Sequence, residues 1–93
     1  PFGAIVELGM ITPGSVLFGG GRALRAEVKA DGTVTCNGRQ GSIHKVGALV
    51  QGRQACNGWT FWHFESEGRL SPIDALREDA KRRLGLVGAE MHA

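Results

Sequence analysis

Three polar residues crowd the beginning of a predicted helix. Ser42, His44 and Lys45 bring a hydroxyl, an imidazole and an ammonium group to the first turn of residues 42–51. Backbone N–H groups of a first turn point outward at the positive end of the helix dipole, so phosphate binds well there. The same residues also suit an ordinary capped helix with two exposed polar side chains, because Ser is a common N-cap. Spacing alone favours the second interpretation.

Further cations extend this positive end or form a separate cluster. Arg39 precedes the predicted helix and Arg53 follows it, so both can enlarge a positive surface. A second cluster stands near the C-terminus, where cations alternate with acids at helical spacing: Arg77, Lys81, Arg82 and Arg83 with Asp74, Glu78 and Asp79. Neighbours three and four apart on a helix form ion pairs. The second cluster is therefore predicted to be an ion-paired surface, not a binding site.

The residues offer little support for catalysis or for a metal site. Cys56 and His63 can form a thiolate–imidazole pair, but no Asn or Asp that would orient the imidazole is identifiable. Cys36, Cys56, His44 and His63 could supply four metal ligands, yet no C-x-x-C or H-x-x-H pair occurs. We predict no catalytic residue, no metal and no cofactor in this chain. Two cysteines without a secretion signal predict reduced thiols in a cytoplasm.

Size and composition place the chain among small globular domains. The sequence has 93 residues, of which 42% are hydrophobic and 22% charged, as is usual for such domains. The net charge of +2 is compatible with a nucleic-acid partner. No apolar run approaches the roughly 20 residues of a membrane span, so no membrane partner is expected. The chain begins without Met, which suggests a fragment of a longer protein whose chemistry lies elsewhere.

The hydrophobic pattern predicts an α+β fold, with a small antiparallel sheet packed against about three helices. We expect an accessory domain over residues 1–84 and a flexible tail over 85–93. The helices are predicted over residues 3–10, 42–51 and 71–84; Ser71 caps the last and Gly85 ends it. The strands are predicted over residues 15–18, in a hairpin over 22–36 that turns at Asp31-Gly32, and in a central strand over 56–64.

The central strand, CNGWTFWHF, would carry aromatic rings on both faces. Alternation places Trp59, Phe61 and His63 on one face and Thr60, Trp62 and Phe64 on the other. Two-sided rings suit a strand covered on both faces in a thin domain. We assign Trp59, Phe61 and Phe64 to the aromatic core. Trp62 is assigned to the rim, where an exposed ring can stack on a nucleobase.

Several long motifs resemble a known family. GSIHKVGALVQ, ACNGWTFWHFE and LSPIDALR, over residues 41–77, resemble the C-terminal region of bacterial cell-cycle-regulated DNA adenine methyltransferases. These are β-class N6-adenine enzymes that methylate GANTC sites. The same region is related to a module associated with restriction enzymes and adenine methylases. PFGAIVELGMITPGSVL and VKADGTV extend the resemblance to most of residues 1–84. The catalytic Asp-Pro-Pro-Tyr-like motif and the Gly-rich cofactor motif of such enzymes do not occur in this sequence.

The resemblance implies a DNA-binding, target-recognition domain that has no activity by itself. The motif serine and tryptophans of the family fall on Ser42, Trp59 and Trp62, and the resemblance reverses the preference at the helix start toward phosphate contact. It implies double-stranded DNA and the catalytic domain of the same parent as partners, S-adenosylmethionine as the parent's cofactor, and a bacterial cytoplasm, near the nucleoid. Three alternatives stay open: a docking or homodimerisation module, a reader of modified DNA, and a thiol enzyme using Cys56.

Overall fold

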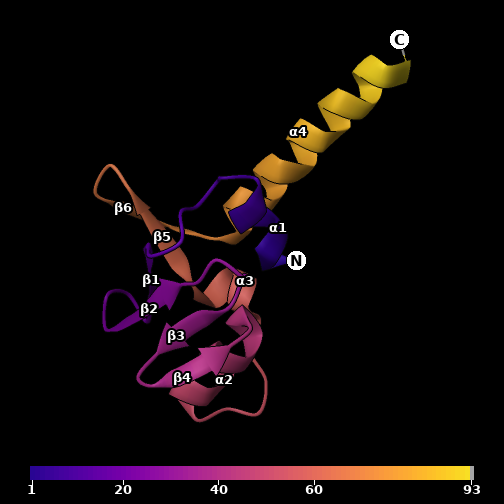
Figure 1. Ribbon diagram of the computed structural model, residues 1–93. Helices are drawn as coiled ribbons and strands as arrows, with labels where there is room; N and C mark the ends of the chain where they lie inside the picture. Colours follow the sequence, from indigo (N-terminus) through magenta and orange to yellow (C-terminus); the bar gives the residue numbers. More distant parts are fainter. Residues whose placement is uncertain (93) are drawn as a thin grey trace.

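The computed structural model describes the backbone of residues 1–92 and the side chains of residues 1–85. These residues form one six-stranded sheet and four helices (Figure 1), which confirms the predicted α+β class. The strands lie in the order β4-β3-β2-β1-β5-β6, and every neighbouring pair is antiparallel. Along the chain the elements are α1 (Phe2–Glu7), β1 (Val16–Gly19), β2 (Leu24–Val28), β3 (Val34–Cys36), β4 (Arg39–Gly41), α2 (Ile43–Gln51), α3 (Gly58–Phe61), β5 (His63–Ser66), β6 (Arg69–Pro72) and α4 (Asp74–His92).

The predicted hairpin is formed by β2 and β3 and is fastened at its turn. Glu27 pairs with Thr35 and Val28 with Val34. In the turn, Asp31 accepts hydrogen bonds from the backbone N–H and the hydroxyl of Thr33, at 3.0 and 2.6 Å. The hydroxyl bond, followed by the backbone bond, holds the pKa of the Asp31 carboxyl below its usual value. The Asp-Gly signal therefore identified this turn correctly.

The prediction of one aromatic strand over residues 56–64 is wrong. Residues 58–61 form the short helix α3, and only His63–Ser66 form a strand, β5. The reason is local: the Asn57 side chain accepts the Trp59 N–H at 3.1 Å and so caps a helix. Asn followed by Gly also marks tight turns, so this dipeptide did not distinguish the two structures. The rings consequently do not alternate across a sheet.

Other parts of the predicted secondary structure also differ from the structure. Strands β4 and β6 were not predicted, and Ser71 does not cap a helix, because it pairs with Phe64 across β5 and β6. Helix α4 does not end at Gly85 but runs on to His92. Glycine lowers helix stability by only about 1 kcal/mol, which an exposed helix tolerates. The flexible tail over 85–93 stays a prediction, since the side chains beyond residue 85 and all of Ala93 lie outside the described residues.

The core lies between the sheet and the helices. Trp62, Leu17, Ile43 and Ile73 are its largest fully buried side chains. Figure 1 shows α2 against β3 and β4, with α3 beside it, while α4 projects away from the sheet. Ile73, which directly precedes α4, and Ala80 within it are buried, whereas Leu84 further along the helix is 61% exposed. No helix in the described part of the chain is long and apolar enough to cross a bilayer.

Candidate nucleic-acid interface

The beginning of α2 has the capped geometry predicted from the sequence. Ser42 is the N-cap, and its hydroxyl oxygen accepts the Lys45 N–H at 3.0 Å. Ile43 and Val46 turn toward the core and are buried. Ser42, His44 and Lys45 are therefore left on the outer side of the first turn, and all three are exposed. The helix ends at Gly52, which has the left-handed conformation usual at such an end (φ 67°).

Strand β4 brings Arg39 to the same side as Lys45. A Cβ added to Gly41 would lie 3.1 Å from Lys45 Cδ, so the aliphatic part of Lys45 lies directly over the last residue of β4. Side chains two residues apart on a strand point to the same face. Arg39 and Gly41 stand in that relation, and Arg39 is exposed. The strand that the sequence did not predict thus helps to place two cations together.

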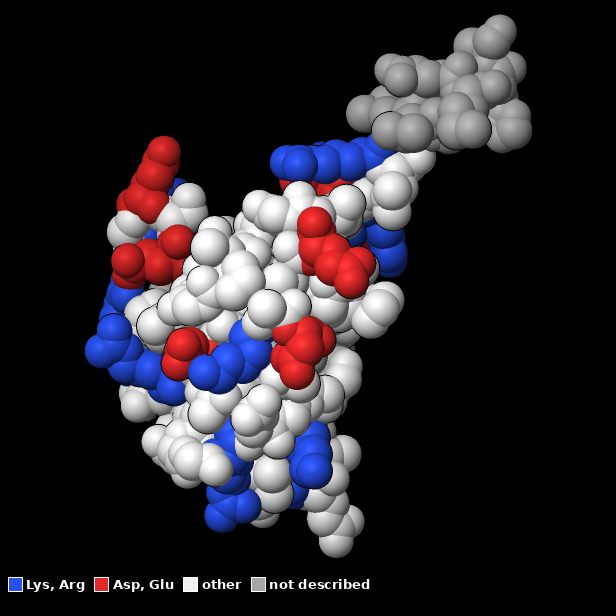
Figure 2. All heavy atoms as spheres, in the orientation of Figure 1, with Lys and Arg blue, Asp and Glu red and all other residues white. Residues whose placement is uncertain are grey.

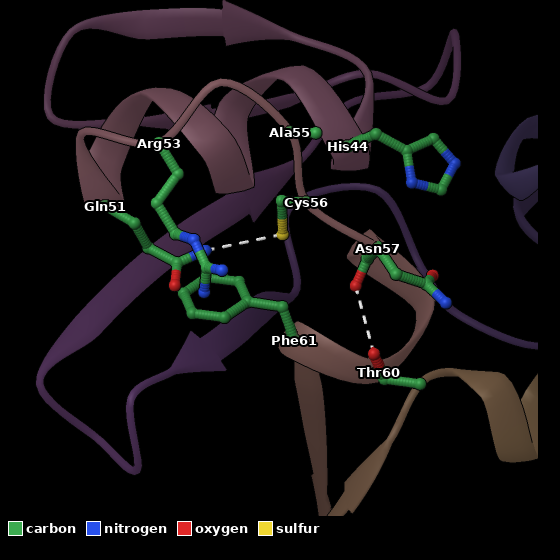
Figure 3. Close-up of a pocket in the computed structure, with 8 residues that line it drawn as sticks. All are labelled: His44, Gln51, Arg53, Ala55, Cys56, Asn57, Thr60 and Phe61. Carbon is green, nitrogen blue, oxygen red and sulfur yellow. Dashed lines mark hydrogen bonds between the residues drawn. The ribbon is translucent and has the colours of Figure 1, made fainter.

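The loop after α2 adds Arg53. The loop over residues 53–57 runs back beside α2 and leaves two neighbouring hollows, the first of which is drawn in Figure 3. His44, Arg53, Ala55 and Cys56 line both hollows. The first also has Gln51, Asn57, Thr60 and Phe61 in its walls, and the second has Ser42, Lys45, Ala48, Leu49 and Gln54. Three of the polar side chains in the first hollow, Gln51, Asn57 and Thr60, were not predicted as site residues.

Cys56 holds this loop against the helix. Its sulfur accepts a hydrogen bond from the Gln51 side-chain amide at 3.4 Å. The same sulfur would lie 2.8 Å from a Cβ on Gly47, so only a glycine at that position of α2 admits the loop so closely. His63 of the suggested thiolate–imidazole pair has another neighbour: its Nδ1 lies 3.0 Å from the Phe61 carbonyl oxygen. Cys56 therefore has a packing role in this structure.

The charge around α2 has a single sign. Between Asp31 and Glu65 the sequence contains no acidic residue, but it contains Arg39, Lys45 and Arg53. Among residues 1–85 the ion pairs are Arg22–Glu65, Lys29–Glu27, Arg77–Asp74, Lys81–Glu78, Arg82–Asp79 and Arg83–Asp79. The last four confirm the predicted ion-paired surface on α4. We call Arg39, Lys45 and Arg53, together with Ser42 and His44, the basic face.

Figure 2 shows this separation of charge on the surface. At the lower end of the molecule, where Figure 1 places α2 and β4, the coloured atoms are blue, and red atoms appear only above it. The sequence argument placed these five side chains near one another, and the structure brings four of them, Ser42, His44, Lys45 and Arg53, to the wall of the second hollow. An anion entering either hollow meets Arg53 and no carboxylate among the lining residues.

Trp62 does not belong to this surface, contrary to the prediction. Its side chain is completely buried, and its indole N–H donates to the Ile43 carbonyl oxygen at 2.9 Å. A buried ring cannot stack on a nucleobase. Trp62 is a core residue because α3 ends just before it and turns its side chain under α2.

The other three aromatic residues take positions in or beside the core. Trp59 is buried, with the Phe2 ring at 6.1 Å in an edge-on arrangement and the Arg77 guanidinium 4.5 Å above it. Phe61 and Phe64 are half-buried and pack against the core. Phe61 also forms part of the wall of the first hollow. Its partly exposed ring thus shares a wall with His44 and Arg53 of the basic face.

No cluster of three or more His, Cys, Asp or Glu side chains that could hold a metal ion occurs within residues 1–85. A scan against protein families matches the model named Restriction Enzyme Adenine Methylase Associated, or RAMA, over residues 1–85. The chain belongs to the RAMA family. The RAMA match covers the sheet, the first three helices and the beginning of α4, and so includes the whole basic face. This RAMA domain is accordingly a module associated with adenine methylases.

Proposed function

We propose that this RAMA domain binds duplex DNA through the basic face and so helps an adenine-N6 methyltransferase to engage its target. The observation that supports this proposal most is the charge around α2: Arg39, Lys45 and Arg53 stand in a segment of 33 residues, 32–64, without a single carboxylate. DNA offers a dense row of phosphates, and cations that neutralise them release condensed counterions. Cations beside hollows that no carboxylate lines, next to the N-terminus of a nine-residue helix, suit that ligand.

The expected binding is weak and depends strongly on salt. If all three cations contact phosphates, the plot of log K against log salt has a slope of about −3, from roughly −0.9 per phosphate. Such contacts position a protein on the duplex without reading its sequence. The domain therefore serves mainly to hold DNA. Joined to a catalytic domain, it raises the effective concentration of DNA at that domain.

The chemistry then belongs to the parent protein. Methyl transfer to adenine needs S-adenosylmethionine and a catalytic motif, and we place both in a separate catalytic domain of the parent. The resemblance of residues 41–77 to cell-cycle-regulated enzymes supports a β-class parent that acts on GANTC sites. Under this proposal the RAMA domain alone has no methyltransferase activity. Its partner is the catalytic domain of the same parent protein.

A salt series with purified domain tests the proposal. Fluorescence anisotropy with a GANTC duplex, a scrambled duplex and an adenine-methylated duplex gives the affinity and the salt slope. The variant Arg39→Ala/Lys45→Ala/Arg53→Ala is expected to lose most of the slope and to bind at least tenfold more weakly. The matched control is Lys81→Ala/Arg82→Ala/Arg83→Ala, which removes three ion-paired cations from α4. Equal loss in both variants would contradict a defined basic face. Preference for the methylated duplex would favour a reader of modified DNA.

A docking role is the second candidate, and two exposed leucines favour it. Leu8 on the C-terminal side of α1 is 47% exposed, and Leu84 on α4 is 61% exposed. The helices that carry them, α1 and α4, are in contact, and exposed apolar side chains that form one continuous patch mark protein contacts. Light scattering of the domain, alone and mixed with the catalytic domain, tests this role. Complex or dimer formation that Leu8→Ser/Leu84→Ser abolishes, without any DNA affinity, would replace the first proposal with this one.

A further inference from the structure

The two ring nitrogens of His44 have different surroundings. Nδ1 accepts the backbone N–H of Gly58 at 2.9 Å, so it carries no hydrogen. A neutral imidazole that accepts through one nitrogen donates through the other, and the hydrogen bond of the first fixes which nitrogen is protonated. Nε2 therefore carries the hydrogen. The structure thus determines the tautomer of His44 through a contact with another helix.

The contact with Gly58 is part of a close joint between α2 and α3. Gly58 is buried, and a Cβ on it would lie 2.6 Å from the Ile43 carbonyl carbon. On the same turn of α2, the Ile43 carbonyl oxygen accepts the Trp62 indole N–H. Two successive residues of α2 thus accept hydrogen bonds from this region. His44 accepts from Gly58 of α3, and Ile43 accepts from Trp62, the residue that follows α3. A buried N–H that is left without its acceptor destabilises the folded state, so Gly58 needs the unprotonated Nδ1.

The Nε2 edge of the ring lies opposite the edge that contacts Gly58. His44 is exposed, and His44 and Arg53 both line the two hollows. None of the side chains lining either hollow is a carboxylate. Figure 3 shows the ring directed away from Cys56 and from Arg53. The Nε2–H is consequently a donor without an acidic acceptor among the residues that line these hollows.

We propose that His44 serves the basic face as a neutral imidazole with two roles. Its Nδ1 positions α3 and the loop that carries Arg53, and its Nε2–H donates a hydrogen bond to a DNA phosphate oxygen. The second role rests on the DNA binding proposed above, whereas the first does not. His44 accordingly contributes a directional hydrogen bond to phosphate without a positive charge, whereas Lys45 and Arg53 contribute positive charges.

The tautomer is measured directly, without DNA. Long-range ¹H–¹⁵N correlation spectra of the ¹⁵N-labelled domain at pH 8 distinguish the two neutral forms and the imidazolium. We expect the pattern of a ring protonated at Nε2 only. A ring protonated at Nδ1, or a rapid mixture of both forms, would overturn the positioning role.

Three variants separate the two roles. In His44→Asn the amide oxygen takes the place of Nδ1, so melting is expected within about 2 °C of the original domain. His44→Ala and His44→Gln both lose the acceptor, and each is expected to melt at least about 4–8 °C lower. His44→Asn melting as low as His44→Ala would overturn the positioning role.

Affinity for duplex DNA tests the donor role in the folded His44→Asn variant. Loss of one neutral hydrogen bond is expected to weaken binding about 2- to 10-fold with an unchanged salt slope. Lys45→Ala is the comparison, because loss of a cation lowers the slope by about 1. A smaller slope in His44→Asn, or unchanged affinity, would overturn the donor role. Absence of binding by the original domain would instead contradict the proposed function and remove the donor role with it. Spectra and melting would still decide the positioning role.

Discussion

Gly58 lies against the backbone of Ile43 so closely that a Cβ would be 2.6 Å from the Ile43 carbonyl carbon and 2.7 Å from its oxygen. This contact is between main chains, so no side-chain rotation can relieve it. It sets the separation of α2 and α3, and with it the position of the loop that carries Arg53.

Gly58→Ala should destabilise the domain by about 1–3 kcal/mol, the usual cost of forcing extra volume into a packed site. Chemical denaturation followed by tryptophan fluorescence measures this, because Trp59 and Trp62 flank the contact. Gly85→Ala is the control, since a Cβ there meets nothing within 4 Å. Equal stability of both variants would mean that the two helices can move apart freely.

Ser42→Asp should fold as well as the original domain but bind DNA much more weakly. Asp caps a helix as well as Ser does, and its charge suits the positive end of the helix dipole. The same charge repels phosphate from the basic face. Ser42→Ala loses the bond to the Lys45 N–H and should cost about 1 kcal/mol of stability. Thermal melts and anisotropy titrations of both variants are the measurements, and a Ser42→Asp variant with full affinity would exclude phosphate at this turn.

Trp62→Phe should reduce stability by about 1–3 kcal/mol, because the Ile43 carbonyl oxygen loses its buried donor. The affinity of the folded fraction for DNA should stay unchanged, since the ring is fully buried. Urea titration and DNA titration below the melting range check the two statements. A variant of normal stability with impaired DNA binding would restore the base-stacking role that the sequence suggested.

The two thiols should differ in reactivity and in their effect at alkaline pH. Burial raises the pKa of the Cys36 thiol, whereas Cys56 is partly exposed. Iodoacetamide at pH 7.5 should therefore modify Cys56 first, as mass spectrometry of peptides would show. Because the folded pKa of Cys36 is the higher one, its contribution to stability is complete below the unfolded thiol pKa of about 8.5 and is lost as pH rises through the folded value.

Comparison with Cys36→Ala isolates this pH effect from other groups that titrate above pH 8.5. The free energy of unfolding of the original domain should fall more steeply with pH than that of the variant. Parallel curves for the two proteins, or simultaneous alkylation of both cysteines, would contradict the burial of Cys36.

The sequence identified the elements whose signals are local. Ser42 capping α2 and Asp31-Gly32 closing the β2–β3 hairpin depend on residues within one or two turns, and both are found in the structure. The ion pairs of α4 also follow from spacing along a single helix. The segment over residues 56–64 was misinterpreted because Asn-Gly fits a hairpin and a helix cap equally well, and the choice depends on what the rings pack against.

The sequence alone determined the class of the fold, the cap at Ser42 and the absence of carboxylates between Asp31 and Glu65, because propensity, capping and charge are properties of neighbouring residues. Only the tertiary structure decided which tryptophans are buried, which nitrogen of His44 is free, and that Arg39, Lys45 and Arg53 surround one end of the molecule. Those outcomes depend on contacts between residues far apart in the chain, such as Gly58 with Ile43 and His44, and no local pattern encodes them.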